Sequence, residues 1–329
     1  MRRRRNWSTR QLLRSRGWCL PILIVLAACS APSGSHRQDF AASTSTSPQP
    51  RPTSPAATSP TPVKLLAEGS PIDPGAMADE LTRVDHLLAR NVRRWQAAGE
   101  PVRSPLARSV SALGLRQQKI YRYLMVHPRL AREVETRVGR PIKQEMQANL
   151  GAAADLSSLV SPVAKVPRYR FAHPLTPKKL RRLYLEAQRR YGVPWSVLAA
   201  INFVESKFGR ILGPSSAGAL GPMQFLPSTF AAYGRGDITD PRDSILAAAR
   251  YLRASGAGSR LKPALFAYNH AHAYVDAVLR YARQMRANDW SFWAYYGYQV
   301  FVTTTRGSVR LTGPGTDHPD HTPGRPAPT

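Results

Sequence analysis

Apolar residues that recur every three or four positions constrain what this chain can fold into more than any other feature. Between residues 77 and 160 the clearest run is Leu81, Val84, Leu88 and Val92, with arginines mostly between them. A period of 3.6 residues places such side chains on one face of a helix, whereas a half-buried strand would show strict alternation. The same spacing returns in residues 180–191 and 274–285. The sequence therefore predicts a mainly α protein.

The first 29 residues read as a targeting segment. Seven arginines and no acid lie within residues 2–16, and the apolar run that follows, from Trp18 to Ala28, is shorter than the roughly 20 residues that span a bilayer. This order is typical of a secretory signal. The end of the run, Leu26-Ala27-Ala28-Cys29, resembles a bacterial lipobox, which implies a lipid anchor at Cys29. An uncleaved anchor helix interrupted by Pro21 is the alternative, and it also places the remaining chain outside the cytoplasm.

Composition divides the rest of the chain. Residues 30–62 are a Ser, Thr, Pro and Ala tract that cannot bury a core, so we predict a disordered tether over 30–71. A helical accessory region is expected over 72–165, and a proline-rich basic bridge from Ser161 to Pro177 marks its end. The main domain is expected over 166–299. Residues 300–329 are predicted to hold a short β-hairpin, turning at Arg306-Gly307, and a disordered tail.

Charge and cysteine content exclude several functions. The chain has 47 Lys and Arg against 20 Asp and Glu, but seven arginines lie in the signal and no nucleic-acid module is recognisable. We therefore predict no nucleic-acid partner and an attraction to anionic lipid or wall polymer, or simply an arginine-rich solvated surface. Cys19 and Cys29 are the only cysteines, so the mature domain has no thiol nucleophile. No metal site or cofactor is predicted, because neither His270 and His272 nor His318 and His321 have further ligands at suitable spacing.

One carboxylate is placed where a basic protein has no evident need for it. Leu198, Ile201, Glu205 and Phe208 are separated by steps of three, four and three residues, which puts Glu205 on the apolar face of a helix. Burial and a nearby helix C-terminus both disfavour the charged form, so the pKa of Glu205 should be raised. A carboxyl group that keeps its proton near neutral pH can act as a general acid. The alternative is a buried ion pair with an arginine such as Arg210.

Other acidic residues have simpler explanations. Asp240, Pro241 and Asp243 form a helix-start pattern, with Asp240 as the N-cap. Glu186 lies on an arginine-flanked helix and is expected to be solvated. Asp237 is the residue that could assist a water molecule if the chemistry were hydrolytic.

Four short motifs in a fixed order carry a family resemblance. Glu205-Ser206 is followed by a Ser/Gly loop, then by Gly-Pro-Met-Gln, then by Ala-Tyr-Asn and a tyrosine-bearing helix. Each motif is common alone, but their order within a helical, exported domain resembles the lytic murein transglycosylases of the lysozyme-like superfamily. The likeness covers roughly residues 180–285. It implies a lysozyme-like domain that acts on peptidoglycan glycan strands.

The resemblance assigns roles to seven residues. Glu205 matches the single catalytic acid and base, and Ser215 matches the serine of a Ser-x-x-Gly-Ala element, although Ser216 makes that alignment uncertain by one position. Substrate contact is implied for Met223, Gln224, Tyr268, Asn269 and Tyr274. Met223 and Tyr268 could equally be core residues. Pro222 stands where many family members have Leu, which affects the turn more than its chemistry.

The resemblance implies non-hydrolytic cleavage of the bond between N-acetylmuramic acid and N-acetylglucosamine, with a 1,6-anhydro product. Most glycosidases use two carboxylates, whereas a single group suffices when the substrate's own acetamido oxygen assists. Two alternatives stay open. One is a muramidase of the same fold that hydrolyses the same bond, and the other is a non-catalytic wall-binding lipoprotein.

Overall fold

Proline and capping residues fix where most helices begin. The computed structural model describes residues 72–314 and 316, so the predicted signal, Cys29 and the tether lie outside the described residues. Helix α1 (Pro74–Ala97), α2 (Pro105–Val126), α5 (Pro177–Tyr191) and α8 (Pro241–Ala254) each have a proline in the first turn. Their N-caps are Asp73, Ser104, Thr176 and Asp240, whose side-chain oxygens accept backbone amides. The predicted N-cap role of Asp240 is confirmed.

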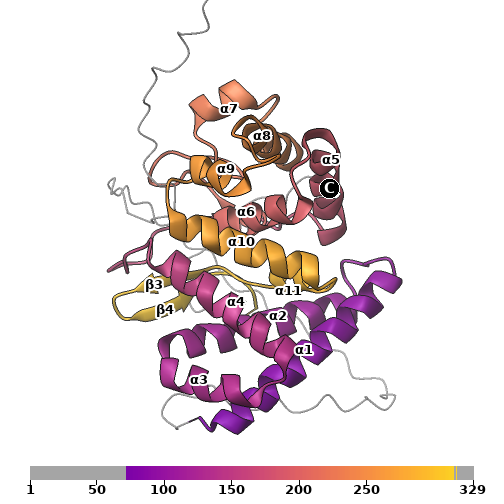
Figure 1. The fold of residues 1–329 in the computed structure, drawn as a ribbon, viewed down its shortest axis with the longest axis vertical. Coiled ribbons are helices and arrows are strands. Elements are labelled where there is room, and N and C mark those ends of the chain that lie inside the picture. The colour runs from indigo at the N-terminus through magenta and orange to yellow at the C-terminus, as the bar shows by residue number, and fades with distance from the viewer. Residues whose placement is uncertain (1–71, 315, 317–329) are drawn as a thin grey trace, which may run out of the picture.

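The described chain is mainly helical, as predicted (Figure 1). The remaining helices are α3 (Pro128–Arg137), α4 (Arg140–Ser157), α6 (Trp195–Ser206), α7 (Pro227–Tyr233), α9 (Leu261–Tyr268), α10 (His272–Ala287) and α11 (Ser291–Tyr296). Two antiparallel strand pairs complete the fold: β1 (Arg170–Phe171) with β2 (Ile211–Leu212), and β3 (Phe301–Thr304) with β4 (Gly307–Arg310). The predicted hairpin is present, but it turns at Thr305 and Arg306, one residue earlier than expected.

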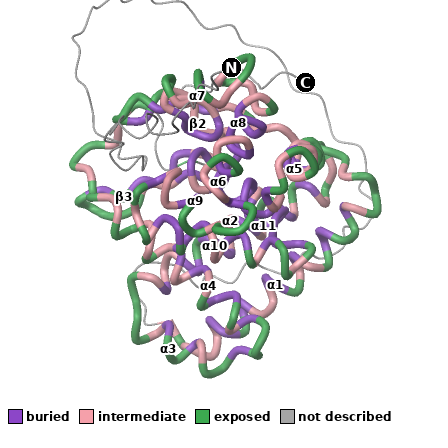
Figure 2. The backbone as a smooth tube through the Cα atoms, turned by 45° about the horizontal axis from the view of Figure 1, so that its top comes forward, coloured by how far each residue is buried: buried purple, intermediate pink, exposed green. Residues whose placement is uncertain are grey.

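Helix α10 is the centre of the molecule. It packs against α4 on one side and α6 on the other, and Figure 1 shows it crossing between the lower helices α1–α4 and the upper helices α5–α9. Its inward residues, among them Tyr274, Val278 and Ala282, are buried. One continuous cluster of buried apolar residues extends from Met77 to Tyr298, so the helices before residue 165 and those after it share a core. Figure 2 shows this buried interior enclosed by exposed segments.

A small second core lies under the hairpin. Phe171, Val300, Val302 and Leu311 are buried together there. The backbone amide of Val163 donates to the carbonyl of Thr303, and the amide of Thr305 donates to the carbonyl of Val163. The proline-rich bridge predicted from Ser161 to Pro177 is therefore attached to the hairpin. The aromatic segment before the hairpin is packed inside, with Phe292 and Tyr295 almost fully buried.

Candidate active site

Glu205 lies in the last turn of α6 with 3% of its surface exposed. The preceding aromatic ring, Phe203, packs edge-on against Tyr281 and tilted against Phe208, so the end of the helix is enclosed by rings. Burial raises the pKa of Glu205 to about 8, against smaller opposing effects from the Tyr274 hydrogen bond and the charge of Lys207. The predicted burial and raised pKa are confirmed.

Tyr274 is the hydrogen-bond donor to this carboxyl group. Its hydroxyl donates to Oε1 of Glu205 over 2.6 Å, from a fully buried position on α10. The alternative partner considered from the sequence, Arg210, is occupied elsewhere. Its Nη2 donates to the carbonyl of Tyr296 over 2.6 Å, and its guanidinium lies over the Tyr296 ring. A neutral donor leaves Glu205 able to hold its proton, whereas a guanidinium would have favoured the ionised form.

The chain reverses sharply after Glu205. We predicted that the helix continues through Phe208, but α6 ends at Ser206. Lys207, Phe208 and Gly209 all have positive φ, at 53°, 65° and 86°. The hydroxyl of Ser206 holds this turn, since it accepts the amide of Gly209 over 2.8 Å and donates to the carbonyl of Pro222 over 2.6 Å. Phe208 is still buried, but the turn rather than helical periodicity places it in the core.

A tight loop brings the Gly-Pro-Met-Gln motif back against α6. Leu220 and Phe225 pair through two backbone hydrogen bonds and close a four-residue turn between them. Gly221 has a φ of 74°, and a Cβ atom there would lie 1.9 Å from the carbonyl oxygen of Ile238. Glycine is therefore required by both backbone conformation and space. Gln224 also has a positive φ, and its side-chain amide donates to the carbonyl of Gly221 over 2.9 Å.

Ser215 supports its own loop. Its hydroxyl accepts the backbone amides of Ala217 and Ala219, over 3.2 and 3.1 Å, and its side chain is buried. Ser216, the alternative position in the alignment, is exposed. The geometry gives Ser215 a loop-forming role, while contact with a sugar stays a prediction.

Met223 and Tyr268 are joined. The Tyr268 hydroxyl donates to the backbone carbonyl of Met223 over 2.6 Å. The side chain of Met223 is fully buried, in keeping with the core role that the sequence left open for it. The charge of Glu205 contributes to a raised pKa of Tyr268, after burial, which places the two groups near each other. Asn269 follows at the end of α9 and is 1% exposed.

The structure thus brings most of the predicted residues into one connected assembly. Glu205 contacts Tyr274, its neighbour Ser206 contacts Pro222, and Met223 contacts Tyr268. These bonds join residues from α6, α9 and α10 around one buried carboxyl group. Ser206 is a residue to which the sequence analysis assigned no role. Its position one residue after the acid and just before a cluster of turn residues was the signal that could have identified it.

The other acidic residues nearby are held in structural contacts. Asp240 accepts the amides of Arg242 and Asp243 as the cap of α8, and Asp243 accepts the amide of Asp237. Asp237 accepts both the amide and the hydroxyl of Thr239. In residues 72–314 and 316, no three His, Cys, Asp or Glu side chains gather as a metal site.

The part of the chain that holds this assembly is similar to known proteins. The family described as Transglycosylase SLT domain matches residues 182–291. A protein named membrane-bound lytic murein transglycosylase F from Thiobacillus denitrificans is 35% identical over 123 residues, covering 35% of this chain and 26% of that protein. Its namesake from Methylobacillus flagellatus is 31% identical over 116 residues, covering 33% and 24%. The membrane-bound lytic murein transglycosylase F 1 of Alkalilimnicola ehrlichii is 33% identical over 124 residues, covering 34% and 24%.

The chain spans about a quarter of the length of these curated relatives. No solved structure gave a significant match. The matched segment begins within α5 and ends at the start of α11, so it contains the whole assembly around Glu205. Residues 182–291 of this chain, which hold the whole assembly around Glu205, therefore match the family described as Transglycosylase SLT domain.

Proposed function

We propose that this chain is an exported lytic transglycosylase that cuts peptidoglycan glycan strands without water. The observation that carries the proposal is Glu205, a buried carboxyl group whose pKa is raised to about 8 and which accepts one hydrogen bond from a neutral tyrosine. A group in this state is protonated at neutral pH and can donate its proton, as a general acid does.

In the proposed reaction Glu205 acts first as the general acid and then as the general base. Protonated Glu205 gives its proton to the glycosidic oxygen as the bond from that oxygen to C1 of N-acetylmuramic acid breaks. The acetamido oxygen of the same sugar bonds to C1. The ionised Glu205 then takes the proton of the C6 hydroxyl, O6 bonds to C1 and the acetamido oxygen leaves. The carboxyl group ends protonated, and the product holds a 1,6-anhydro ring.

The contacts of the other carboxylates support a route with a single acid and base. Glu186 is engaged by Arg242 and Arg190 on the protein surface. Asp237, Asp240 and Asp243 serve the turn and cap before α8. A hydrolytic muramidase with two carboxylates would need a second group that activates a water molecule, and these four groups are already engaged in other contacts.

A membrane-attached location completes the proposal. The relatives are named as membrane-bound proteins. In the part of the chain that the structure describes, no helix is long and apolar enough to cross a bilayer. We propose that Cys29 carries a lipid and that residues 30–71 hold the enzyme at a distance from the membrane.

Product analysis tests the proposed chemistry. The full chain, purified in mild detergent, is incubated with purified sacculi, and the released fragments are examined by mass spectrometry. Anhydromuropeptides, lighter than the hydrolytic products by the mass of one water, are expected. Reducing-end muropeptides would show a muramidase instead, and intact sacculi would show a wall-binding protein without turnover.

Tyr274 is expected to tune the proton affinity of Glu205. In Tyr274→Phe the ionised carboxylate loses its 2.6 Å hydrogen bond. Loss of a bond to a charged group predicts a fall in kcat of about 10- to 100-fold. Because activity needs protonated Glu205, kcat/KM of the wild type should decline as the pH rises through about 8. That decline should move to higher pH in the variant, since the hydrogen bond lowers the pKa.

Tyr281→Phe is the matched control for this prediction. Tyr281 lies on the same helix, and its ring packs against Phe203 and Tyr295. It should keep the wild-type pH profile. An unchanged alkaline limb in Tyr274→Phe would show that the hydroxyl does not act on Glu205.

A further inference from the structure

A pocket of about 610 Å³ lies at the opposite end of α6 from Glu205. Trp195, the first residue of α6, lines it, and Glu205 lies ten residues further along the same helix. At 1.5 Å per residue the two positions are about 15 Å apart along the helix axis. The pocket is therefore separate from the assembly around the catalytic carboxyl group.

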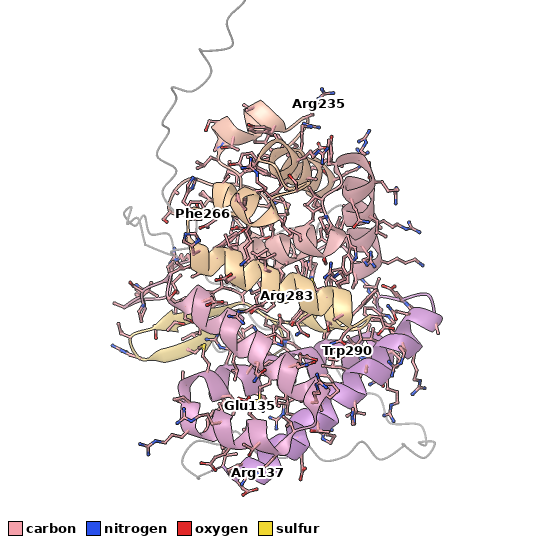
Figure 3. All side chains as sticks on the ribbon, in the orientation of Figure 1. Glu135, Arg137, Arg235, Phe266, Arg283 and Trp290 are labelled. Atoms are coloured by element: carbon pink, nitrogen blue, oxygen red, sulfur yellow. The ribbon has the colours of Figure 1, made fainter. Side chains whose placement is uncertain are left out.

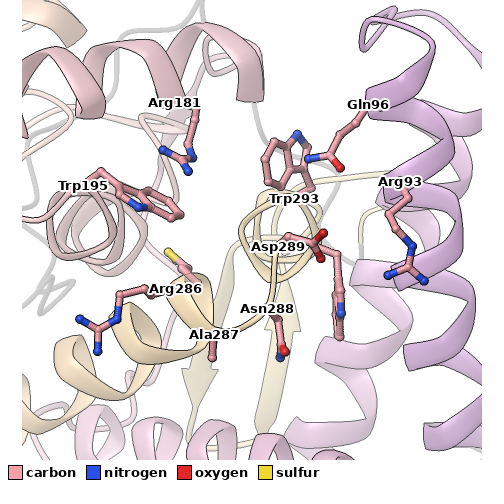
Figure 4. A pocket seen from close by; sticks show the side chains of 11 residues that line it. Arg93, Gln96, Arg181, Trp195, Arg286, Ala287, Asn288, Asp289 and Trp293 are labelled. Carbon is pink, nitrogen blue, oxygen red and sulfur yellow. The ribbon is translucent and has the colours of Figure 1, made fainter.

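Arginine and tryptophan dominate the walls. The lining includes Arg93, Arg181, Arg286, Trp195, Trp290 and Trp293. Figure 4 shows Arg93 and Gln96 on α1 facing Arg181 and Trp195 across the pocket, with Arg286 below them. Asp289 is the acidic residue in the lining, so the three arginines leave an excess of positive charge. The helices before residue 165 thus complete a site together with the SLT domain.

Arg181 holds unused hydrogen-bond donors in this pocket. Its guanidinium lies 3.5 Å from the centre of the Trp195 ring. Its Nε and Nη1 atoms are buried, and no hydrogen-bond partner for them exists among the described residues. Burial lowers the pKa of Arg181 from its usual value, and arginine stays charged regardless. Buried donors without partners are costly, which indicates that a ligand supplies the acceptors.

We propose that this pocket is a second binding site for the peptidoglycan strand, specific for its carboxylate groups. The inference rests on the proposed function for the identity of the polymer. A guanidinium matches the planar geometry of a carboxylate through paired N–H donors. Indole rings provide apolar surface suited to the C–H faces of a sugar. A strand held here keeps the enzyme on the wall between cuts, which gives the helices before residue 165 a role in binding.

Binding is best measured with a chain that cannot consume its ligand. The parent is the full chain with Glu205→Gln, and the assay is cosedimentation with purified sacculi. The pocket variant adds Arg93→Glu and Arg286→Glu, two exposed rim residues. The charge-matched control adds Arg137→Glu and Arg235→Glu, exposed residues that lie at opposite ends of the molecule in Figure 3, away from Trp290. Arg181→Met tests the buried donors while it keeps an apolar side chain over Trp195.

The pocket variant and Arg181→Met should bind sacculi at least about tenfold more weakly than the parent, as expected when charge-assisted contacts are lost. The control should bind like the parent. Parent binding should be lost when the carboxyl groups of the sacculi are amidated, and kept when hydrofluoric acid has removed phosphate-linked polymers. Thermal unfolding of each variant separates lost binding from lost folding. If the pocket variant binds like the control, or if binding follows the phosphate polymers, the inference is wrong.

The two proposals can fail separately. In chains that keep Glu205, the pocket substitutions should leave the cleavage rate of a short soluble glycan unchanged, because such a glycan need not reach the pocket. Anhydro products together with normal binding by the pocket variant would contradict the second site alone. Pocket-dependent binding by a chain that yields no anhydro product would contradict the proposed reaction and leave the site standing.

Discussion

Glu205→Gln is expected to remove the release of anhydromuropeptides almost completely. Glutamine has nearly the same shape and can still accept the Tyr274 hydrogen bond, but it can neither donate nor take up a proton at this site. General acid–base catalysis is worth 10² to 10⁴, and the proposed reaction uses this carboxyl group for both proton transfers, so we expect a fall in rate of about 10⁴-fold. The measurement is the initial rate of product release from purified sacculi at pH 6 to 7.

Stability measurements show whether such a loss is chemical. Glu205 is enclosed, and its ionised form is disfavoured there by burial, so a neutral amide should not weaken the fold. Because the pKa of Glu205 rises from 4.5 to about 8 on folding, the wild type loses stability between these pH values, whereas Glu205→Gln does not. Thermal unfolding of Glu205→Gln should therefore exceed that of the wild type by an amount that grows from about pH 4.5 to about pH 8. Glu205→Asp provides a second comparison, because it keeps the carboxyl group but withdraws it by one methylene. A displacement of that size is expected to cost about 10²-fold. Substantial anhydro product from a folded Glu205→Gln chain would refute the assignment.

Sequence periodicity predicted the buried position of Glu205 because burial on a helix depends on local spacing alone. Leu198 and Ile201 fix the apolar face of α6, and Glu205 shares it. The N-cap of α8 was predictable for the same reason, since Asp240 bonds to residues two and three positions away. Local rules fail at the end of α6. The helix stops at Ser206 because three successive residues adopt left-handed conformations, and only Gly209 among them favours that conformation intrinsically.

Long-range contacts explain what the sequence could not give. The Ser206 hydroxyl reaches Pro222, 16 residues away, and Tyr274 reaches Glu205 over a separation of 69 residues. No spacing rule predicts these partners. The motif resemblance pointed to Tyr274 but did not say which residue it contacts. It also pointed to Met223, but it did not show that the side chain of Met223 is buried while its backbone carbonyl accepts the Tyr268 hydroxyl. The pocket beside Trp195 is lined by residues of α1, α5, α6, α10 and α11, so no single stretch of sequence indicates it.

A second buried acidic pair lies in the helices before residue 165, where the sequence analysis found no chemistry. The side-chain amide of Gln117 donates to Asp85 over 2.7 Å and to Glu145 over 3.0 Å. The Tyr298 hydroxyl donates to the Gln117 oxygen, which fixes the amide orientation. Asp85 and Glu145 are both almost fully buried. Asp85 lies four residues after Leu81 and three before Leu88 and so shares their buried face of α1, but only the tertiary fold brings Glu145 beside it.

Glu80, a buried carboxylate five residues before Asp85, has its pKa shifted in the opposite direction to this pair. Burial acts against the charge of Glu80, yet its hydrogen bonds with Arg83 and Arg116 lower its pKa overall. Asp85 and Glu145 instead lie near Gln117 and the hydroxyl-bearing rings of Tyr121, Tyr295 and Tyr298. No cation contributes to the pKa shift of either carboxyl group. Burial raises the pKa of Asp85 from 3.8 to about 7, and burial together with the charge of Asp85 raises the pKa of Glu145. Both groups are therefore driven toward their protonated forms.

The protein is expected to lose stability as the pH rises from 4 to 8, and Asp85→Asn/Glu145→Gln should remove the share of that loss that this pair causes, while the share caused by Glu205 remains. Folded pKa values above the unfolded ones mean that the folded state binds more protons. The stabilisation is complete below the unfolded value of 3.8 and is lost as the pH rises through about 7. For Asp85 alone this shift corresponds to a change on the order of 4 kcal/mol. The difference in Tm between the double variant and the wild type should grow by about 10 °C in favour of the variant from pH 4 to pH 8.

Asp79→Asn is the matched control, because Asp79 lies on the same helix and is exposed. It should follow the wild-type pH dependence. A double variant that lost stability with pH in parallel with the wild type would show that Asp85 and Glu145 ionise freely in the folded state. The pair matters beyond stability because Gln117 and Tyr298 connect it to the end of the α10–α11 region, and Tyr298 packs against Phe203, two residues before Glu205. We therefore expect ionisation of this pair to weaken packing in the aromatic core that also borders Glu205.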